Sequence, residues 1–226
     1  MAQGICTYCL AVEALTDDHI PPACLFGTPR PPGLITVPSC PTCNQLGSKD
    51  DEYFKLVLAV RRDISKHPVI ERIRPGALRS LERSEAHWFA RAFISTFRVA
   101  RFPGSQGIPE KRLTYDVDLD RLYRVISRTT QGLYFHAVGK PVDRACSVYA
   151  VGDEQILALG DDSVARIRQE FAGAPTHNFG EGVFTVQGLR NQEDQRESLW
   201  LMLFYGRVPF LSATFLDNRD LSQQTV

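Results

Sequence analysis

Long apolar runs are absent from this sequence, and so is net charge. No segment is apolar for long enough to cross a bilayer. The first residues also lack the basic segment followed by an apolar one that marks a secretion signal. We therefore expect a cytoplasmic protein with no membrane partner, in which cysteines stay reduced. The 26 Lys and Arg residues balance 26 Asp and Glu residues over 226 positions, and 43% of residues are hydrophobic. This composition predicts a globular chain of one large domain or two small ones.

Positive charge is concentrated in the middle of the chain. Residues 61–130 hold 15 Lys and Arg against 8 Asp and Glu. Residues 1–60 hold 3 against 6, and residues 131–226 hold 8 against 12. A basic middle between acidic ends predicts either a surface that binds a polyanion or arginine-rich helix faces that are only solvated.

Cysteines are few, but four of the six form two Cys-x-x-Cys pairs. The four are Cys6, Cys9, Cys40 and Cys43. In a reducing compartment this spacing indicates a metal site, and four thiolates close a tetrahedral structural site around one Zn²⁺. The alternative is a rubredoxin-like iron site, but such sites usually have Gly after each pair, where this chain has Leu10 and Asn44. The remaining Cys24 and Cys146 are expected to be small core residues.

An acid, an imidazole and an amide accompany these pairs. Asp18 and His19 precede Ile-Pro-Pro, and Asn44 directly follows the second pair. A neutral imidazole takes a proton from water near pH 7, and Mg²⁺ and Mn²⁺ prefer oxygen ligands such as Asp and Asn. Neighbouring strand residues point to opposite faces, so Asp18 and His19 reach one phosphate only at a strand end or bulge. The alternative roles are a packed or surface histidine and, for Asn44, a helix N-cap.

Taken together, these residues resemble a known family over about residues 5–54. The matching residues are Cys6, Cys9, Asp18, His19, Pro22, Cys40, Cys43 and Asn44. The segment is similar to an HNH endonuclease of the ββα-metal class, in its zinc-ribbon-bearing form. The resemblance implies that His19 is the general base. It also implies that Asp18 and Asn44 hold one catalytic Mg²⁺ or Mn²⁺, which stabilises the scissile phosphate and the leaving 3′ oxygen. The family's middle Asn is missing, because Gly33 or Leu34 occupies its position. We expect a backbone carbonyl to hold the imidazole Nδ1–H instead.

The whole chain is predicted to have an α+β fold with two parts. Residues 1–62 form the zinc-stabilised ββα-metal module, and residues 63–226 form an α+β domain that is helical over 77–131 and mostly strands over 132–216. In the module, strands at 19–20 and 34–37 form a hairpin, and a helix capped by Ser48 runs to Arg61. The expected later helices are 77–100, 119–130 and 162–171. The expected strands, mainly antiparallel, are 133–138, 147–151, 155–159, 182–186, 198–205 and 209–216.

Other charged residues have two interpretations. Six arginines fall on two predicted helix faces and are candidates for phosphate binding: Arg91, Arg98, Arg101, Arg121, Arg124 and Arg128. Solvated helix faces are the alternative. Asp50 and Asp51 are interpreted as acids favoured by the helix dipole at a helix start, rather than as metal ligands. His136 is interpreted as a structural residue of a strand.

The sequence therefore predicts a metal-dependent endonuclease that hydrolyses phosphodiester bonds of nucleic acid, with DNA favoured over RNA. Its cofactors would be a structural Zn²⁺ and a catalytic Mg²⁺ or Mn²⁺, and its C-terminal domain is a candidate surface for self-association or a regulatory partner. The alternative is a non-catalytic zinc-ribbon protein that binds nucleic acid or acts as a scaffold with a degenerate HNH site. Iron electron transfer is a third hypothesis. Intact Asp18, His19 and Asn44 favour the enzyme, whereas Gly33 in place of Asn favours the non-catalytic protein.

Overall fold

The computed structural model of the chain describes residues 3–82, 87–102 and 109–217. In chain order its elements are β1 (Gln3–Ile5), β2 (Val12–Ala14), β3 (Thr16–Ile20), η1 (Ala23–Leu25), β4 (Ile35–Ser39), α1 (Pro41–Val60), α2 (Pro68–Arg79), η2 (Ser80–Glu82), α3 (His87–Ser95), β5 (Arg98–Phe102), β6 (Glu110–Thr114), α4 (Leu119–Val138), β7 (Cys146–Gly152), α5 (Asp153–Ala158), α6 (Asp161–Phe171), β8 (Thr176–Phe179), β9 (Phe184–Arg190), β10 (Ser198–Phe204) and β11 (Val208–Leu216).

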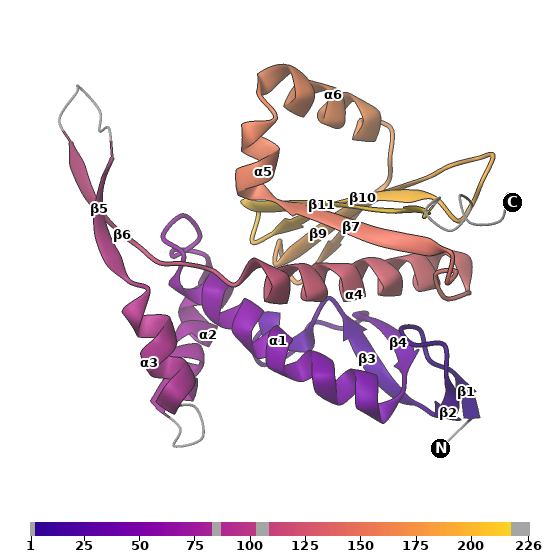
Figure 1. Ribbon diagram of the computed structural model, residues 1–226, viewed down its shortest axis with the longest axis horizontal. Coiled ribbons are helices and arrows are strands. Elements are labelled where there is room, and N and C mark those ends of the chain that lie inside the picture. Colours follow the sequence, from indigo (N-terminus) through magenta and orange to yellow (C-terminus); the bar gives the residue numbers. More distant parts are fainter. Residues whose placement is uncertain (1–2, 83–86, 103–108, 218–226) are drawn as a thin grey trace, which may run out of the picture.

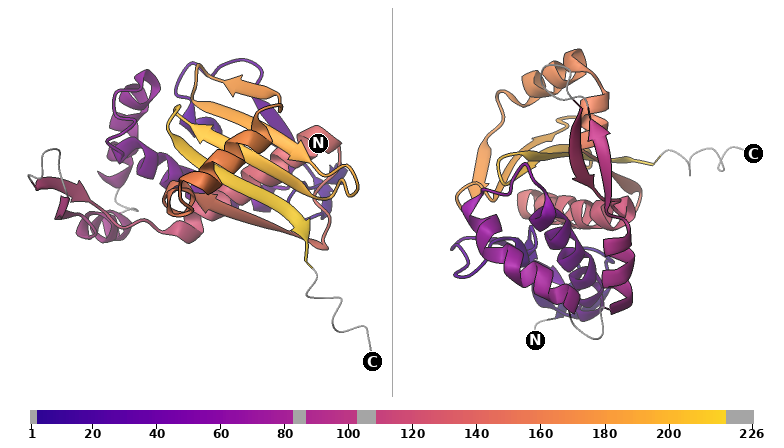
Figure 2. Two further views of the ribbon diagram at one scale, coloured as in Figure 1. Left: turned by 90° about the horizontal axis from the view of Figure 1, so that it is seen from above. Right: turned by 90° about the vertical axis from the view of Figure 1, so that its left-hand side faces the viewer.

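Helix α4 lies between two layers of the molecule (Figure 1). On one side are β3, β4 and α1. On the other side is a five-stranded antiparallel sheet with the strand order β7-β11-β10-β9-β8. Helix α6 crosses the opposite face of this sheet (Figure 2). The predicted mixed α+β class with a C-terminal antiparallel sheet is therefore confirmed. Of the helices that the structure describes, none has the length and apolar content that a bilayer crossing requires.

One hydrophobic cluster joins the N-terminal elements to the sheet. Phe54 of α1 is fully buried. Its ring centroid lies 5.2 Å from that of Phe204 on β10 and 5.8 Å from that of Phe210 on β11. Residues along β10 and β11 alternate between buried and partly buried, because one face of the sheet packs on the core. The N-terminal elements are thus fixed to the rest of the molecule by packed aromatic rings.

The N-terminal region has the predicted hairpin but an earlier helix. Strands β3 and β4 pair antiparallel, with His19 opposite Thr36. Helix α1 starts at Pro41, not at Ser48, because the Cys40 side chain accepts from a backbone N–H as the N-cap and proline is favoured in the first turn. The second Cys-x-x-Cys pair is therefore continuous with the helix.

The predicted helix at 77–100 is wrong. Helix α2 begins at Pro68, with His67 as its N-cap, and α3 ends at Ser95. The next residues form β5, which pairs antiparallel with β6 in a hairpin that extends away from the sheet and α4 (Figure 1). This pairing overrides the helical periodicity of the sequence. Residues 83–86 of the predicted helix lie outside the described residues.

Helix α4 is longer than the predicted 119–130, so the predicted strand at 133–138 is also wrong. Gly132 does not end the helix, because it is a point of close contact: a Cβ there would lie 2.4 Å from Cγ1 of Ile20 on β3. Gly139, with φ 75°, ends the helix instead. His136 is therefore an exposed helix residue rather than a strand residue.

The C-terminal predictions are mostly confirmed. Strands predicted at 147–151, 182–186, 198–205 and 209–216 correspond to β7, β9, β10 and β11, and the helix at 162–171 to α6. The predicted strand at 155–159 is instead helix α5, whose start is stabilised where Gly152 N–H donates to Gln155 Oε1 at 3.1 Å. Cys24 and Cys146 are partly buried against the core, as predicted.

Candidate metal centre and active site

The four cysteines form a compact sulfur cluster. The ligand atoms of Cys6, Cys9, Cys40 and Cys43 all lie within 4.8 Å of one another. The Sγ atoms of Cys9 and Cys40 are 3.7 Å apart. A tetrahedral Zn²⁺ site with Zn–S bonds of ~2.3 Å places its sulfurs about 3.8 Å apart. The geometry of the cluster therefore fits one tetrahedral metal ion.

Backbone amides prepare the cluster for a cation. Burial disfavours the thiolate of Cys6, but N–H groups of Cys9, Cys40 and Tyr8 donate toward its sulfur and lower its pKa to about 7. Burial and the neighbouring thiols raise the pKa of Cys43. Leu10 adopts the left-handed conformation, with φ 63°, in the turn where glycine was expected for an iron site. A thiolate forms readily at Cys6, and full deprotonation of the cluster requires a bound metal.

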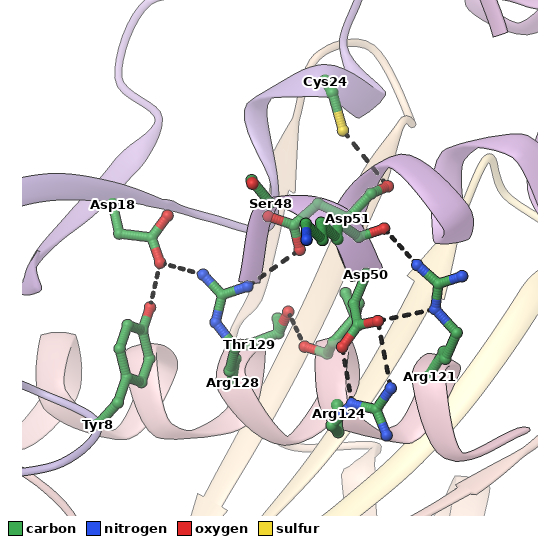
Figure 3. A network of polar contacts seen from close by, with 12 residues as sticks. Tyr8, Asp18, Cys24, Ser48, Asp50, Asp51, Arg121, Arg124, Arg128 and Thr129 are labelled. Atoms are coloured by element: carbon green, nitrogen blue, oxygen red, sulfur yellow. Dashed lines mark hydrogen bonds and ion pairs between the residues drawn. The ribbon is translucent and has the colours of Figure 1, made fainter. Parts of the chain in front are cut away.

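Beside the sulfur cluster lies a second group, which we call the carboxylate cluster: Asp18, Asp51, Tyr8 and Arg128. Asp18 is 7% exposed on β3. Its Oδ2 accepts hydrogen bonds from Tyr8 Oη at 2.7 Å and from Arg128 Nη2 at 2.5 Å (Figure 3). Arg128 Nη1 donates to Asp51 Oδ1 at 3.1 Å. Asp18 Oδ1 has no hydrogen bond to any residue that the structure describes, so this oxygen is available to a ligand.

The charges of the carboxylate cluster do not balance. With both carboxylates ionised, one guanidinium faces two negative charges, and one net negative charge remains. Burial, with a smaller contribution from Asp18, raises the pKa of Asp51 to about 6, although Arg128 lowers it. Burial and the charge of Asp18 also raise the pKa of Tyr8, so its phenol stays protonated and donates. The cluster therefore favours a further cation at neutral pH.

Arg128 reaches the carboxylates because the residue of α1 that its side chain passes is a glycine, Gly47. A Cβ on Gly47 would lie 1.7 Å from Arg128 Nη1. Glycine inside a helix costs about 1 kcal/mol relative to alanine, so its presence here has a packing reason. Gly47 leaves the space through which the guanidinium passes from α4 to β3.

The arginines of α4, predicted as candidates for phosphate binding, are paired with acids of the chain. Arg121 Nε and Arg124 Nε donate to Asp50 at 2.8 and 2.7 Å, and Arg128 binds the carboxylate cluster (Figure 3). Burial alone would raise the pKa of Asp50, but these two arginines lower it. Asp50 and Asp51 lie in the middle of α1, so the interpretation of them as helix-start acids is also wrong.

The other predicted arginines lie elsewhere. Arg98 is on β5 and is paired with Asp116. Arg91 on α3 and Arg101 on β5 are exposed and have no ion pair with a residue that the structure describes. Of the six arginines, these two remain candidates for contacts with a polyanion.

His19 is half-buried, next to the end of β3. Its side chain makes no hydrogen bond with a described residue, so the expected carbonyl partner is not found. Gly33 has φ 76°, and a Cβ added to it would have no described atom within 4 Å, so this position offers no replacement for the family's Asn. Thr36 lies directly opposite His19 in the register of the hairpin.

Asn44 lies in the first turn and a half of α1. Its Nδ2 donates to Thr16 Oγ1 at 3.0 Å, and its backbone N–H donates to Cys40 O at 3.0 Å. Its side-chain Oδ1 has no hydrogen bond within the part of the chain that the structure describes. Asn44 is therefore anchored at its nitrogen and available at its oxygen.

One cavity of about 680 Å³ brings the predicted site residues together. Asp18, His19 and Asn44 all line it, and so does Asp51. The Cys24 thiol also lines the cavity, and burial raises its pKa to about 12, which disfavours the thiolate.

Sequence reasoning missed the roles of Tyr8, Arg128 and Asp51. A buried carboxylate requires a counter-ion or donors, but nothing in the spacing identified which ones. Gly47 would have been a signal if the helix had been predicted to start at Pro41 rather than Ser48, because a glycine inside a helix often marks a close approach of another group.

Comparisons with known proteins add no assignment: no protein-family model, no curated protein and no solved structure matches the chain.

Proposed function

We propose that this chain is a metal-dependent endonuclease of the HNH type. The observation that carries the proposal is the convergence of Asp18, His19 and Asn44 on one cavity beside the sulfur cluster. The antiparallel pair β3–β4 followed by α1 supports a ββα-metal fold for this region. The spacing of the sulfurs supports Zn²⁺ as the ion of the cluster, in a structural role, because four thiolates leave no open position for substrate.

His19 acts as the general base in this proposal. Both ring nitrogens are free of hydrogen bonds to described residues, and the imidazole is half-buried at the cavity. A neutral imidazole takes a proton from a water molecule as that water attacks the phosphorus atom. His19 lies next to the end of β3. Neighbouring residues were expected to reach one phosphate only at a strand end or bulge, and this position allows His19 and Asp18 to face one cavity.

Asp18 and Asn44 supply oxygens for one divalent cation. Tyr8 and Arg128 hold the Asp18 carboxylate at Oδ2 and leave Oδ1 available, which is the usual arrangement of supporting partners around a metal-binding carboxylate. The residual negative charge of the carboxylate cluster favours a cation there. When bound, Mg²⁺ or Mn²⁺ would supply positive charge to the phosphate and the leaving 3′ oxygen. Because Mg²⁺ sites often contain only one or two carboxylates, with water and phosphate completing the shell, two protein oxygens are sufficient.

The test is incubation of the zinc-loaded chain with plasmid DNA and with RNA, with and without Mg²⁺ or Mn²⁺. We expect cleavage that requires the added cation. His19→Ala should reduce the rate by about 10²–10⁴-fold, since this is the usual contribution of a general base. His136→Ala is the matched control, because this histidine is exposed on α4 and does not line the cavity. Equal rates for His19→Ala and the parent, at equal zinc content, would refute the assignment of the base.

The second candidate is a non-catalytic zinc-ribbon protein that binds nucleic acid. The observation that favours it is His19 itself, whose imidazole has no partner among the described residues to fix its orientation. This candidate predicts binding of nucleic acid without cleavage under every cation condition, and His19→Ala would leave that binding unchanged.

A further inference from the structure

The cavity at His19 has a second wall that the proposed chemistry does not use. Tyr53, Trp88 and Phe89 line it, from α1 and α3. Trp88 is 75% exposed, whereas Tyr53 is 4% exposed. An indole that remains in water beside a cavity offers a large apolar face to a ligand. We call Tyr53, Trp88 and Phe89 the aromatic wall.

The inner part of the aromatic wall, Tyr53 and Phe89, is held in place by neighbouring side chains. The ring centroids of Trp88 and Phe89 are 6.1 Å apart, and those of Tyr53 and Phe89 are 5.9 Å apart, both edge to face. The Arg121 guanidinium lies 4.3 Å from the Tyr53 centroid and 5.5 Å from the Phe89 centroid. Arg121 is fixed in turn by Asp50. Tyr53 and Phe89 are thus supported by neighbouring side chains, whereas Trp88 contacts Phe89 and otherwise remains exposed.

The lining of the same cavity contains cations beside the acids Asp17, Asp18, Asp51 and Glu52. Arg30 and Lys49 line it, and neither forms an ion pair with a residue that the structure describes. An aromatic face beside unpaired cations matches a nucleotide, in which a flat base is joined through one sugar to a phosphate. A cavity of about 680 Å³ is within the size range of small-ligand sites.

We propose that the cavity binds single-stranded nucleic acid, with an unpaired base stacked on Trp88 and the adjacent phosphodiester at His19. In a duplex both faces of a base are covered by its neighbours, so the indole has nothing to stack on. Stacking of an unpaired base on an aromatic side chain contributes about 1–3 kcal/mol. The position of the phosphate rests on the proposed function, whereas the stacking of the base does not.

Binding is tested in the His19→Ala background without added Mg²⁺ or Mn²⁺, because cleavage is expected to need both the base and the cation. The probes are a short DNA strand, the RNA strand of the same sequence and the DNA duplex. The readout is tryptophan fluorescence together with an independent anisotropy titration. Trp200, the other tryptophan, is 7% exposed and bonded to Ser198, so quenching by a base reports on Trp88.

Trp88→Ala should weaken binding of a single strand by about 5- to 150-fold, which is 1–3 kcal/mol converted at 1.4 kcal/mol per tenfold. Trp88→Phe should retain most of the affinity, and duplex binding should be unaffected by either change. Tyr149→Ala is the matched control, because this aromatic residue is 62% exposed on β7 and does not line the cavity. The DNA and RNA arms show which sugar is preferred.

Tighter binding of duplex than of single strand would overturn the inference. So would unchanged single-strand affinity in a well-folded Trp88→Ala variant. If the protein binds single strands through Trp88 but cleaves no nucleic acid, the stacking site is retained and the proposed nuclease is rejected. Cleavage at the same rate with and without Trp88 would retain the proposed nuclease and reject the stacking site.

Discussion

The sulfur cluster and the carboxylate cluster lie side by side in the N-terminal region, yet they are built on different principles. The four cysteines come from two short segments within 38 positions of one another. The carboxylate cluster already has Arg128, which comes from α4, 110 positions after Asp18. The sulfur cluster has the geometry of a metal site, whereas the carboxylate cluster already contains a cation supplied by the chain.

The difference follows from what each set of ligands requires when it is buried. Burial and neighbouring thiols raise the pKa of Cys43, and backbone N–H groups stabilise the thiolate that forms readily at Cys6, so the sulfur cluster needs no guanidinium from the chain. The Asp18 side chain is buried. Burying an unpaired carboxylate is costly, so the fold supplies a guanidinium. The second cluster therefore depends on the packing of α4 against α1, and the first does not.

Removing the zinc site should have the largest effect. Cys40→Ser deletes one sulfur and alters the N-cap of α1. Structural zinc contributes about 10–16 kcal/mol in small zinc modules, so we expect loss of the metal and unfolding of the N-terminal region. Zinc content by elemental analysis and thermal unfolding measure this.

Cys146→Ser is the control for that variant, because Cys146 lies outside the cluster and should leave the zinc content at one per chain. A Cys40→Ser protein with full zinc and an unchanged melting temperature would show that the sulfur cluster is not a structural site.

Removing the guanidinium should have the next largest effect. Arg128→Met leaves Asp18 and Asp51 buried without a cation, and breaking a buried ion pair costs about 3–5 kcal/mol. Added Mn²⁺ should restore part of this stability, and should do so more than in the parent protein. Urea unfolding with and without Mn²⁺ measures both effects.

Arg124→Met, on the same helix α4, is the matched control for Arg128→Met. Arg124 is 57% exposed and Asp50 keeps Arg121, so its loss should cost less than about 1 kcal/mol. Gly47→Ala forces Arg128 aside without removing a charge, and should mimic Arg128→Met in weaker form. Equal losses for Arg124→Met and Arg128→Met would mean that the carboxylate cluster has no special dependence on its guanidinium.

A smaller effect is expected from pH. Burial raises the pKa of Asp51 to about 6 in the folded chain, against about 3.9 in an unfolded one. The folded state thus binds more protons than the unfolded state between about pH 4 and 6, so stability falls as pH rises through that window, by at most about 1.4 kcal/mol per pH unit. Asp51→Asn should remove this component. The difference between the unfolding free energies of parent and variant, measured across the window, should vary with pH, and a constant difference would contradict it.

How much of this could be predicted from the sequence depends on how local each feature is. The cysteine spacing and the hairpin at Asp18 and His19 are short-range, and the sequence contains them. The last two strands were also predictable, because alternation and a turn at Gly206 define them. Features that depend on distant partners were not. Gly132 is a helix end by local rules, but a contact point with Ile20 in the fold.

The same limit applied to the arginines of α4. Their spacing on one helix face is visible in the sequence, but the direction of that face is not. Asp50 and Asp51 on α1 turned out to be their partners, which changes the interpretation from phosphate binding to internal support. Similarly, the strands β5 and β6 pair antiparallel, and the helical period in the sequence gave no indication of this pairing.

The most direct test of the central claim, that Asp18 binds a divalent cation while Tyr8 and Arg128 hold its other oxygen, is a Mn²⁺ titration. It uses the zinc-loaded chain in the His19→Ala background with nucleic acid bound, and the free Mn²⁺ is followed by electron paramagnetic resonance. We predict one Mn²⁺ per chain, and loss of that ion in Asp18→Asn with the zinc content unchanged. No bound Mn²⁺, or a Mn²⁺ stoichiometry that Asp18→Asn leaves intact, would contradict the claim.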